Sequence, residues 1–217
     1  MHRRLWILVA LCGLFSPRGW AIVETDASTQ RIALGKGPLT HLTPLRILPP
    51  WRGRDQVHFV CAPSFESIKV LTLSGSGEAW MLRVWETDEI SNLLIKDKPV
   101  LIAKRAIGRD LAELLYRTWV NALLEVRATN ISTAAVDGVC YAFSSWVYGL
   151  GELSGEANNP QVEAPPLWLA EIGDALVAYT KTSAPDEKGI SRIRDLCNRT
   201  LAFISEQQAA LAVPSAR

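Results

Sequence analysis

The chain has 217 residues, of which 48% are hydrophobic, and its 23 basic and 22 acidic residues give a formal net charge of +1. A near-neutral protein lacks the basic excess that binds phosphate backbones, so the charge balance argues against nucleic acid as a partner. The length is sufficient for one domain with a substantial hydrophobic core.

The first 21 residues have the pattern of a secretory signal peptide. Two arginines precede an apolar run at 5–15, and the segment 17–21 then combines a helix-breaking proline with small residues. The run is shorter than the roughly 20 residues that span a bilayer. A lipoprotein modified at Cys12 is disfavoured, because Leu11 occupies the position where a small residue is expected. We expect cleavage near Ala21 and a periplasmic or extracellular protein that does not insert into the membrane.

The next part of the chain predicts an extended arm followed by strands. Residues 22–54 are rich in prolines and show no sustained period, which is typical of an irregular N-terminal arm before a folded domain at 55–208. Runs at 90–95 and 100–104 flank a turn and predict a hairpin. Before them, short runs rich in β-branched and aromatic residues predict strands at 56–61, 67–73 and 78–86.

The period of the apolar residues then changes to that of a helix. Apolar residues at three- and four-residue spacing predict an amphipathic helix over 109–127. A strand at 136–146 follows, then a helix that starts at the prolines 165–166, and a last helix with its apolar stripe at 190–204. Residues 209–217 are expected to be disordered. The order predicts an α+β fold: an antiparallel meander sheet of four to six strands with three helices packed mainly on one face.

Three cysteines remain after the expected cleavage. In an oxidising compartment two of them can pair. Cys61 and Cys140 both fall in predicted strands, so one hypothesis is a Cys61–Cys140 disulfide with Cys197 buried in the last helix. The alternative is that all three are free, buried thiols that act as small hydrophobic residues.

The segment between residues 148 and 166 is the first candidate site. It is rich in glycine and acidic residues, and we predict a long loop from which Glu152 and Glu156 project. Two carboxylates near a strand end can act as an acid–base pair or bind a cation. A phosphate-binding loop is excluded, because the acids repel phosphate and no lysine follows the last glycine. The alternative is a solvated connection with no function.

The second candidate is one face of the predicted sheet. Trp85 shares a strand face with Met81 and Arg83, because side chains alternate along a strand. Left uncovered, this face would be an unusually apolar surface for a monomer. We expect the arm at 22–54, with Trp51, to lie across it. The alternative is a surface for a partner, since tryptophan and arginine concentrate binding energy.

Catalytic and metal-binding motifs are weak. Ser154 lacks the leading glycine of a hydrolase nucleophile elbow, and no histidine follows it in the chain. The histidines His41 and His58 have no ligand spacing with the cysteines, so we expect neither a metal site nor a cofactor. A catalytic pair between His58 and Cys140 across the sheet stays open.

Taken together, these patterns favour binding over catalysis. We expect an exported, soluble protein-binding domain of the bacterial cell envelope, most concretely an inhibitor or immunity-type protein. Its partner would be another protein, and its binding residues would be Trp85, Met81, Arg83, Glu152 and Glu156. Two alternatives remain: a glycan-directed hydrolase that uses the two carboxylates of the glycine-rich loop, and a structural subunit of an envelope assembly.

Overall fold

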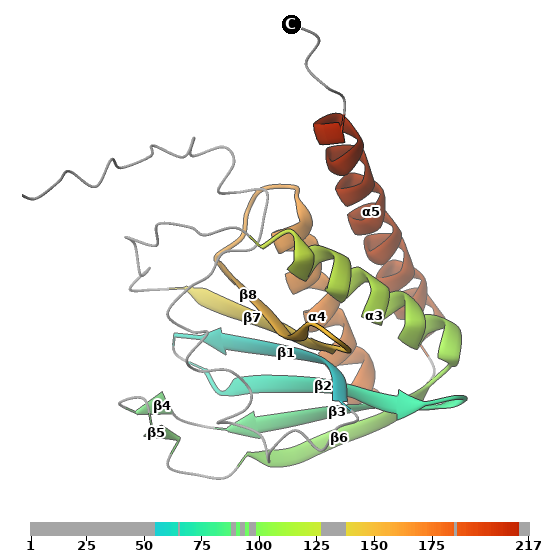
Figure 1. Cartoon of the computed structure of the whole chain (residues 1–217). Helices are drawn as coiled ribbons and strands as arrows, with labels where there is room; N and C mark the ends of the chain where they lie inside the picture. The colour runs from blue at the N-terminus through green and yellow to red at the C-terminus, as the bar shows by residue number, and fades with distance from the viewer. Residues whose placement is uncertain are drawn as a thin grey trace, which may run out of the picture.

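The computed structural model describes residues 55–64, 66–87, 90–91, 94–95, 99–126, 138–184 and 186–212. The expected signal peptide and the arm at 22–54, including Trp51, lie outside these residues. The described part of the chain has the predicted α+β fold, in which helices cover one face of an antiparallel sheet (Figure 1).

Six strands form the sheet in the order β6-β3-β2-β1-β7-β8, and all neighbours are antiparallel. Strands β1, β2, β3 and β6 form a meander, whereas β7 and β8 add to the other side of β1. The first strand of the described residues is therefore central, and β6 and β8 are the two edges of the described sheet. The strands are β1 (Asp55–Pro63), β2 (Ile68–Ser76), β3 (Ala79–Thr87), β6 (Val100–Ile107), β7 (Val139–Val147) and β8 (Gly151–Asn158).

The predicted hairpin between residues 90–95 and 100–104 is wrong. Strands β4 (Ile90–Ser91) and β5 (Leu94–Ile95) pair with each other in a separate two-stranded ladder, and β6 pairs with β3. A local hairpin would have left one edge of β3 without hydrogen-bond partners, and pairing with β6 satisfies that edge.

The predicted loop after β7 is also corrected, because it contains β8. This strand pairs with β7 from Gly151 to Asn158. It alternates polar residues on one face with small or apolar residues on the other, so it lacks the β-branched run that usually marks a strand. Its backbone groups satisfy the exposed edge of β7.

Three described helices form two further layers on one side of the sheet (Figure 1). Helices α3 (Arg109–Leu124) and α4 (Pro165–Lys181) pack on the sheet, and α5 (Glu187–Ala212) packs chiefly on these two helices. We call the helix-covered side of the sheet the inner face. Its buried apolar side chains include Val57, Phe59, Leu71, Leu73, Leu82, Val84 and Phe143.

Trp119 of α3 fills the centre of this core. Its side chain is fully buried, and its ring meets the Phe143 ring edge-on at a centroid distance of 5.9 Å. The indole N–H donates to the backbone oxygen of His58 at 3.1 Å. On α4, a Cβ added to Gly173 would lie 2.3 Å from the Phe59 ring, so the helix approaches the sheet closely only because this residue is glycine.

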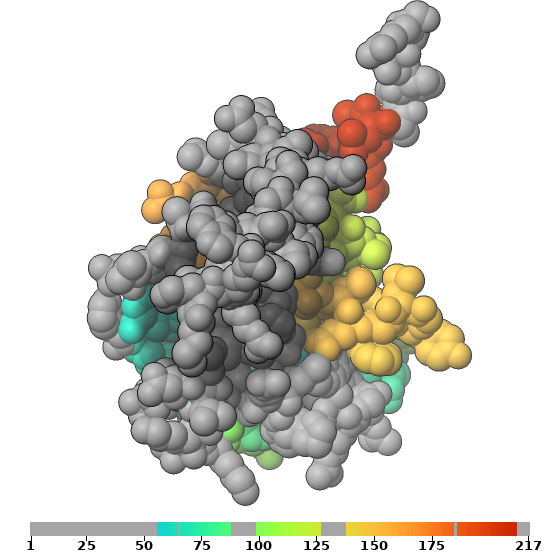
Figure 2. All heavy atoms as spheres, turned by 60° about the vertical axis from the view of Figure 1, so that its left-hand side comes forward, coloured from blue at the N-terminus to red at the C-terminus, as the bar shows by residue number. Residues whose placement is uncertain are grey.

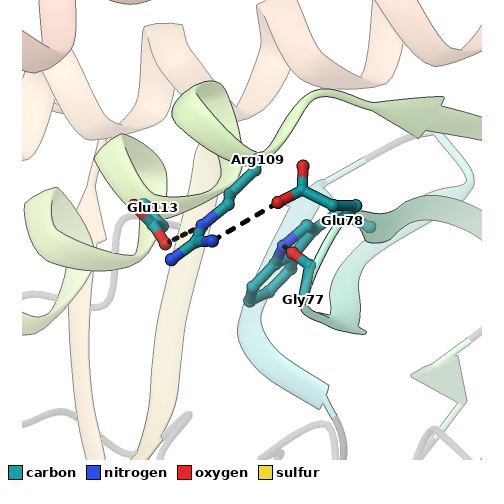
Figure 3. Close-up of polar contacts among 5 residues, drawn as sticks. Gly77, Glu78, Arg109 and Glu113 are labelled. Atoms are coloured by element: carbon teal, nitrogen blue, oxygen red, sulfur yellow. Dashed lines mark hydrogen bonds and ion pairs between the residues drawn. The ribbon is translucent and has the colours of Figure 1, made fainter.

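The turn between β2 and β3 is attached to the start of α3. It consists of Gly77 and Glu78, and Gly77 has the left-handed φ of +59° that a two-residue hairpin turn requires. The Arg109 guanidinium contacts Glu78 Oε1 at 3.3 Å and Glu113 Oε1 at 2.6 Å (Figure 3). These pairs are exposed, so they orient the turn but add little to stability.

Helix α5 extends further than predicted. Its stripe of Ile193, Cys197 and Ile204 is buried, as expected. The helix ends at Ala212, so residues 209–212 are helical and the predicted start of the disordered tail is wrong. Of the helices in the described ranges, none has both the length and the apolar character needed to cross a membrane.

Candidate functional site

The five residues predicted to bind a partner all lie on the outer face of the sheet, opposite the helices. Met81, Arg83 and Trp85 are on β3, and Glu152 and Glu156 are on β8. Four strand spacings of about 4.8 Å separate the two groups by roughly 19 Å, so the structure brings the two candidates onto one face but not into one site. The register places Trp85 and Glu156 at opposite ends of one row that runs through Val70, Val60 and Ala142.

Much of the outer face is buried within the chain. Glu156 is only 4% exposed, and the side chains of Met81, Arg83 and Trp85 are half-buried. Between the two groups lie buried polar residues on the three central strands, namely Thr72, His58 and Ser144. In this conformation the predicted binding residues expose little surface to a partner, and binding by the outer face stays a prediction.

His58 lies in the middle of the outer face and is 2% exposed. Burial lowers the pKa of its imidazole to about 3, so the ring is neutral at physiological pH. His58 pairs with Ser144, which is four residues and therefore about 13 Å along β7 from Cys140. The catalytic pair that the sequence left open between His58 and Cys140 is not formed.

The geometry of β8 does not favour the two glutamates as an acid–base pair. Glu152 and Glu156 are four residues apart on one strand, a backbone separation of about 13 Å. The two carboxyl groups of glycosidases are closer, at roughly 5–10 Å. Burial raises the pKa of Glu152, and a hydrogen bond with the Ser144 side chain opposes that rise. Each glutamate is therefore better described as an individual polar group of the sheet.

The predicted disulfide between Cys61 and Cys140 is wrong. Cys61 pairs with Tyr141, and Cys140 pairs with Ala62, so the two cysteines are one residue out of phase on neighbouring strands. Their side chains therefore point to opposite faces of the sheet, and their sulfur atoms cannot bond. The three cysteines of the described residues are free, with Cys61 and Cys197 buried.

We expect the buried thiols to resist alkylation in the native protein. Burial raises the pKa of Cys61 to about 12 and that of Cys197 to about 11. At pH 8 only about one Cys61 side chain in ten thousand is the reactive thiolate. Peptide mass spectrometry after iodoacetamide treatment should find both residues labelled only when denaturant is present. Equal labelling rates with and without denaturant would contradict this.

The turn between β7 and β8 is an exposed apolar feature that sequence reasoning missed. Tyr148 is 99% exposed, Leu150 62% and Trp146 54%, and we call these three residues the hairpin tip. The β7–β8 segment, yellow in Figure 2, projects from the rest of the molecule. The Leu150 N–H donates to the Val147 oxygen at 3.1 Å, and Gly149, with φ of +83°, allows this tight turn. The sequence feature that could have indicated this tip is the stretch 139–151, which contains aromatic residues and no charged residue.

A shallow pocket of about 190 Å³ opens between β7, the segment after β8, and α4. The Tyr141 hydroxyl donates to Asp174 Oδ2 at 3.1 Å across it. Burial raises the pKa of both groups. No sequence pattern predicted this pocket, because its residues lie far apart in the chain and each fits the period of its own strand or helix. The remaining lining residues are Val139, Asn159, Pro160, Gln161, Leu167, Ala170 and Glu171.

The described residues contain no group of three or more His, Cys, Asp or Glu side chains placed to hold a metal ion. Comparison with protein-family models, curated proteins and solved structures finds no match for the chain. Function is therefore inferred from the chemistry of the surfaces themselves, chiefly the hairpin tip and the pocket.

Proposed function

We propose that this protein is an exported binding protein of the bacterial cell envelope that inserts its hairpin tip into an apolar cleft of another protein. The observation that carries the proposal is the exposure of Trp146, Tyr148 and Leu150 on one projecting turn. Aromatic residues in such positions concentrate the binding energy of protein interfaces. The export part of the proposal rests on the signal-peptide pattern of the first 21 residues.

The hairpin tip is well suited to binding because its backbone is already ordered. The β-turn hydrogen bond and the pairing of β7 with β8 hold the tip residues in one conformation. Tyrosine and tryptophan also have few rotatable bonds, so they lose little conformational entropy on burial. A preorganised apolar projection that fills a cleft suits an inhibitor or immunity-type protein, which acts by occupying a site on its target.

Charge favours a protein over a lipid surface as the partner. Segments that bind membranes at the interface usually combine apolar residues with lysine and arginine, which attract anionic lipids. The stretch 139–151 has no charged residue, and the next residue is Glu152. The tip therefore offers apolar contact without attraction to an anionic bilayer.

The double variant Tyr148→Ser/Leu150→Ser is expected to lose the partner. An interface hot spot contributes 2 kcal/mol or more, so removing these two side chains of the tip should weaken binding by about 30-fold or more. The measurement is affinity capture from the native envelope with the full chain, followed by titration of the captured protein against wild type and variant.

Two matched variants make this experiment selective. Leu211→Ser removes another exposed apolar side chain, 71% exposed near the end of α5, and should leave binding unchanged. Trp85→Ala/Met81→Ala removes the half-buried pair on the outer face. Loss of the partner in this second variant, with binding retained in the tip variant, would place the interface on the outer face instead. Tip-dependent binding to lipid vesicles, with no protein captured, would also contradict the proposal.

A further inference from the structure

We propose that the pocket between β7 and α4 is a binding site for the protonated primary amine of a small ligand or side chain. The proposal is independent of the hairpin tip, because the tip and the pocket share no residue.

The size of the pocket indicates an end group rather than a whole drug-sized molecule. Its volume is about 190 Å³. Sites for drug-sized ligands are larger, at about 300–1,000 Å³. A short alkyl chain with one polar head fits this space.

The charge of the lining favours a cation. Its polar side chains include two carboxylates, Asp174 and Glu171, and no basic side chain is among the lining residues. Glu171 already has a cation nearby, since Arg192 lies 3.6 Å from it. Asp174 has a hydroxyl partner in Tyr141 but no salt bridge with any described residue. Asp174 is therefore the carboxylate with which a ligand ammonium would pair.

The surroundings of Asp174 support this pairing. Asp174 is an exposed residue that lines the pocket. Partial burial of its carboxyl raises the pKa, against the opposing hydrogen bonds from Tyr141 and Cys61 and the charge of Lys69. Lys69 is itself 3.7 Å from Glu66. A ligand ammonium would add the charge-assisted hydrogen bond that the carboxylate lacks.

The rest of the pocket matches the other parts of an amine ligand. The Tyr141 hydroxyl donates to Asp174 and keeps its lone pairs available, so it can also accept a hydrogen bond from the ammonium. Val139, Leu167 and Ala170 provide an apolar wall for the alkyl part.

The test is a titration of the full chain with matched probes, in which binding is monitored through the NMR chemical shifts of the pocket residues. The probes are n-butylammonium, 1-butanol as its neutral analogue of the same size, and Nα-acetyl-lysine methylamide. We expect saturable shifts at Tyr141 and Asn159 with the two amines, and we expect 1-butanol to bind about two- to fivefold more weakly than n-butylammonium. Tighter binding of n-butylammonium would identify a free amine as the source, and tighter binding of the lysine probe would identify a peptide side chain.

Variants connect the binding to the carboxylate. Asp174→Asn keeps the shape, removes the charge and should weaken n-butylammonium binding by about two- to fivefold, as expected for an ion pair at an exposed residue. Asp195→Asn, on the exposed side of α5, should not change it. The proposal is overturned if no amine gives saturable shifts up to about 50 mM, or if 1-butanol binds as well as n-butylammonium. Because the probe comparison uses the wild-type protein, this second criterion holds even if a variant fails to fold.

Discussion

Replacement of Trp119 by alanine is expected to lower the free energy of unfolding by about 3–5 kcal/mol. The side chain is fully buried between α3 and the sheet, where its ring contacts Phe143. The substitution leaves a large cavity and also removes the donor to the buried backbone oxygen of His58. Urea unfolding followed by circular dichroism measures the loss directly.

Trp146→Ala is the matched control for this prediction. It removes the same side chain from an exposed position on the hairpin tip. Surface substitutions usually change stability by less than about 0.5 kcal/mol. Similar losses in the two variants would mean that Trp119 is not the centre of the core.

His58 is expected to make the protein less stable in acid. Its folded-state pKa of about 3 lies below the ordinary value of 6.5, so below pH 6.5 the unfolded chain binds a proton that the folded protein does not. The contribution of His58 is therefore fully present above pH 6.5 and is lost as the pH falls toward 3. The slope approaches about 1.4 kcal/mol per pH unit below pH 6.5, and the loss between pH 6.5 and 4.5 is about 2 kcal/mol.

The variant His58→Gln isolates this effect because glutamine does not titrate. Glu152 and Asp174 have pKa values raised by burial, so their protonation stabilises the folded state in acid. This effect is the same in wild type and variant and cancels in the comparison. As the pH falls, the wild type should therefore lose more unfolding free energy than the variant. Any stability advantage of the wild type at neutral pH should shrink or change sign. Parallel pH profiles for the two proteins would show that His58 does not titrate differently on folding.

Local periodicity predicted the parts of the fold that depend on local pattern. The 3.6-residue period found α3, and its buried residues include Leu111, Leu115 and Trp119. The strand predicted at 136–146 corresponds to β7, whose Tyr141 and Phe143 lie on the inner face. The proline pair at 165–166 marked the start of α4.

Features that depend on long-range pairing were not predictable in this way. The partner of β6 is set by the free edge of β3, and the polar strand β8 is set by the free edge of β7. The disulfide prediction failed for a related reason, since it required a register between β1 and β7 that no local pattern contains. The pocket likewise depends on the contact between Tyr141 and Asp174, which are 33 residues apart.

The measurement that most directly tests binding by the hairpin tip is site-specific photo-crosslinking in the native cell. A photoreactive phenylalanine replaces Tyr148 in the full chain, and in a control it replaces Glu206, which is exposed on α5. We predict a discrete protein adduct from position 148 and none from position 206. An adduct from neither position, or from position 206 alone, would contradict binding through the tip.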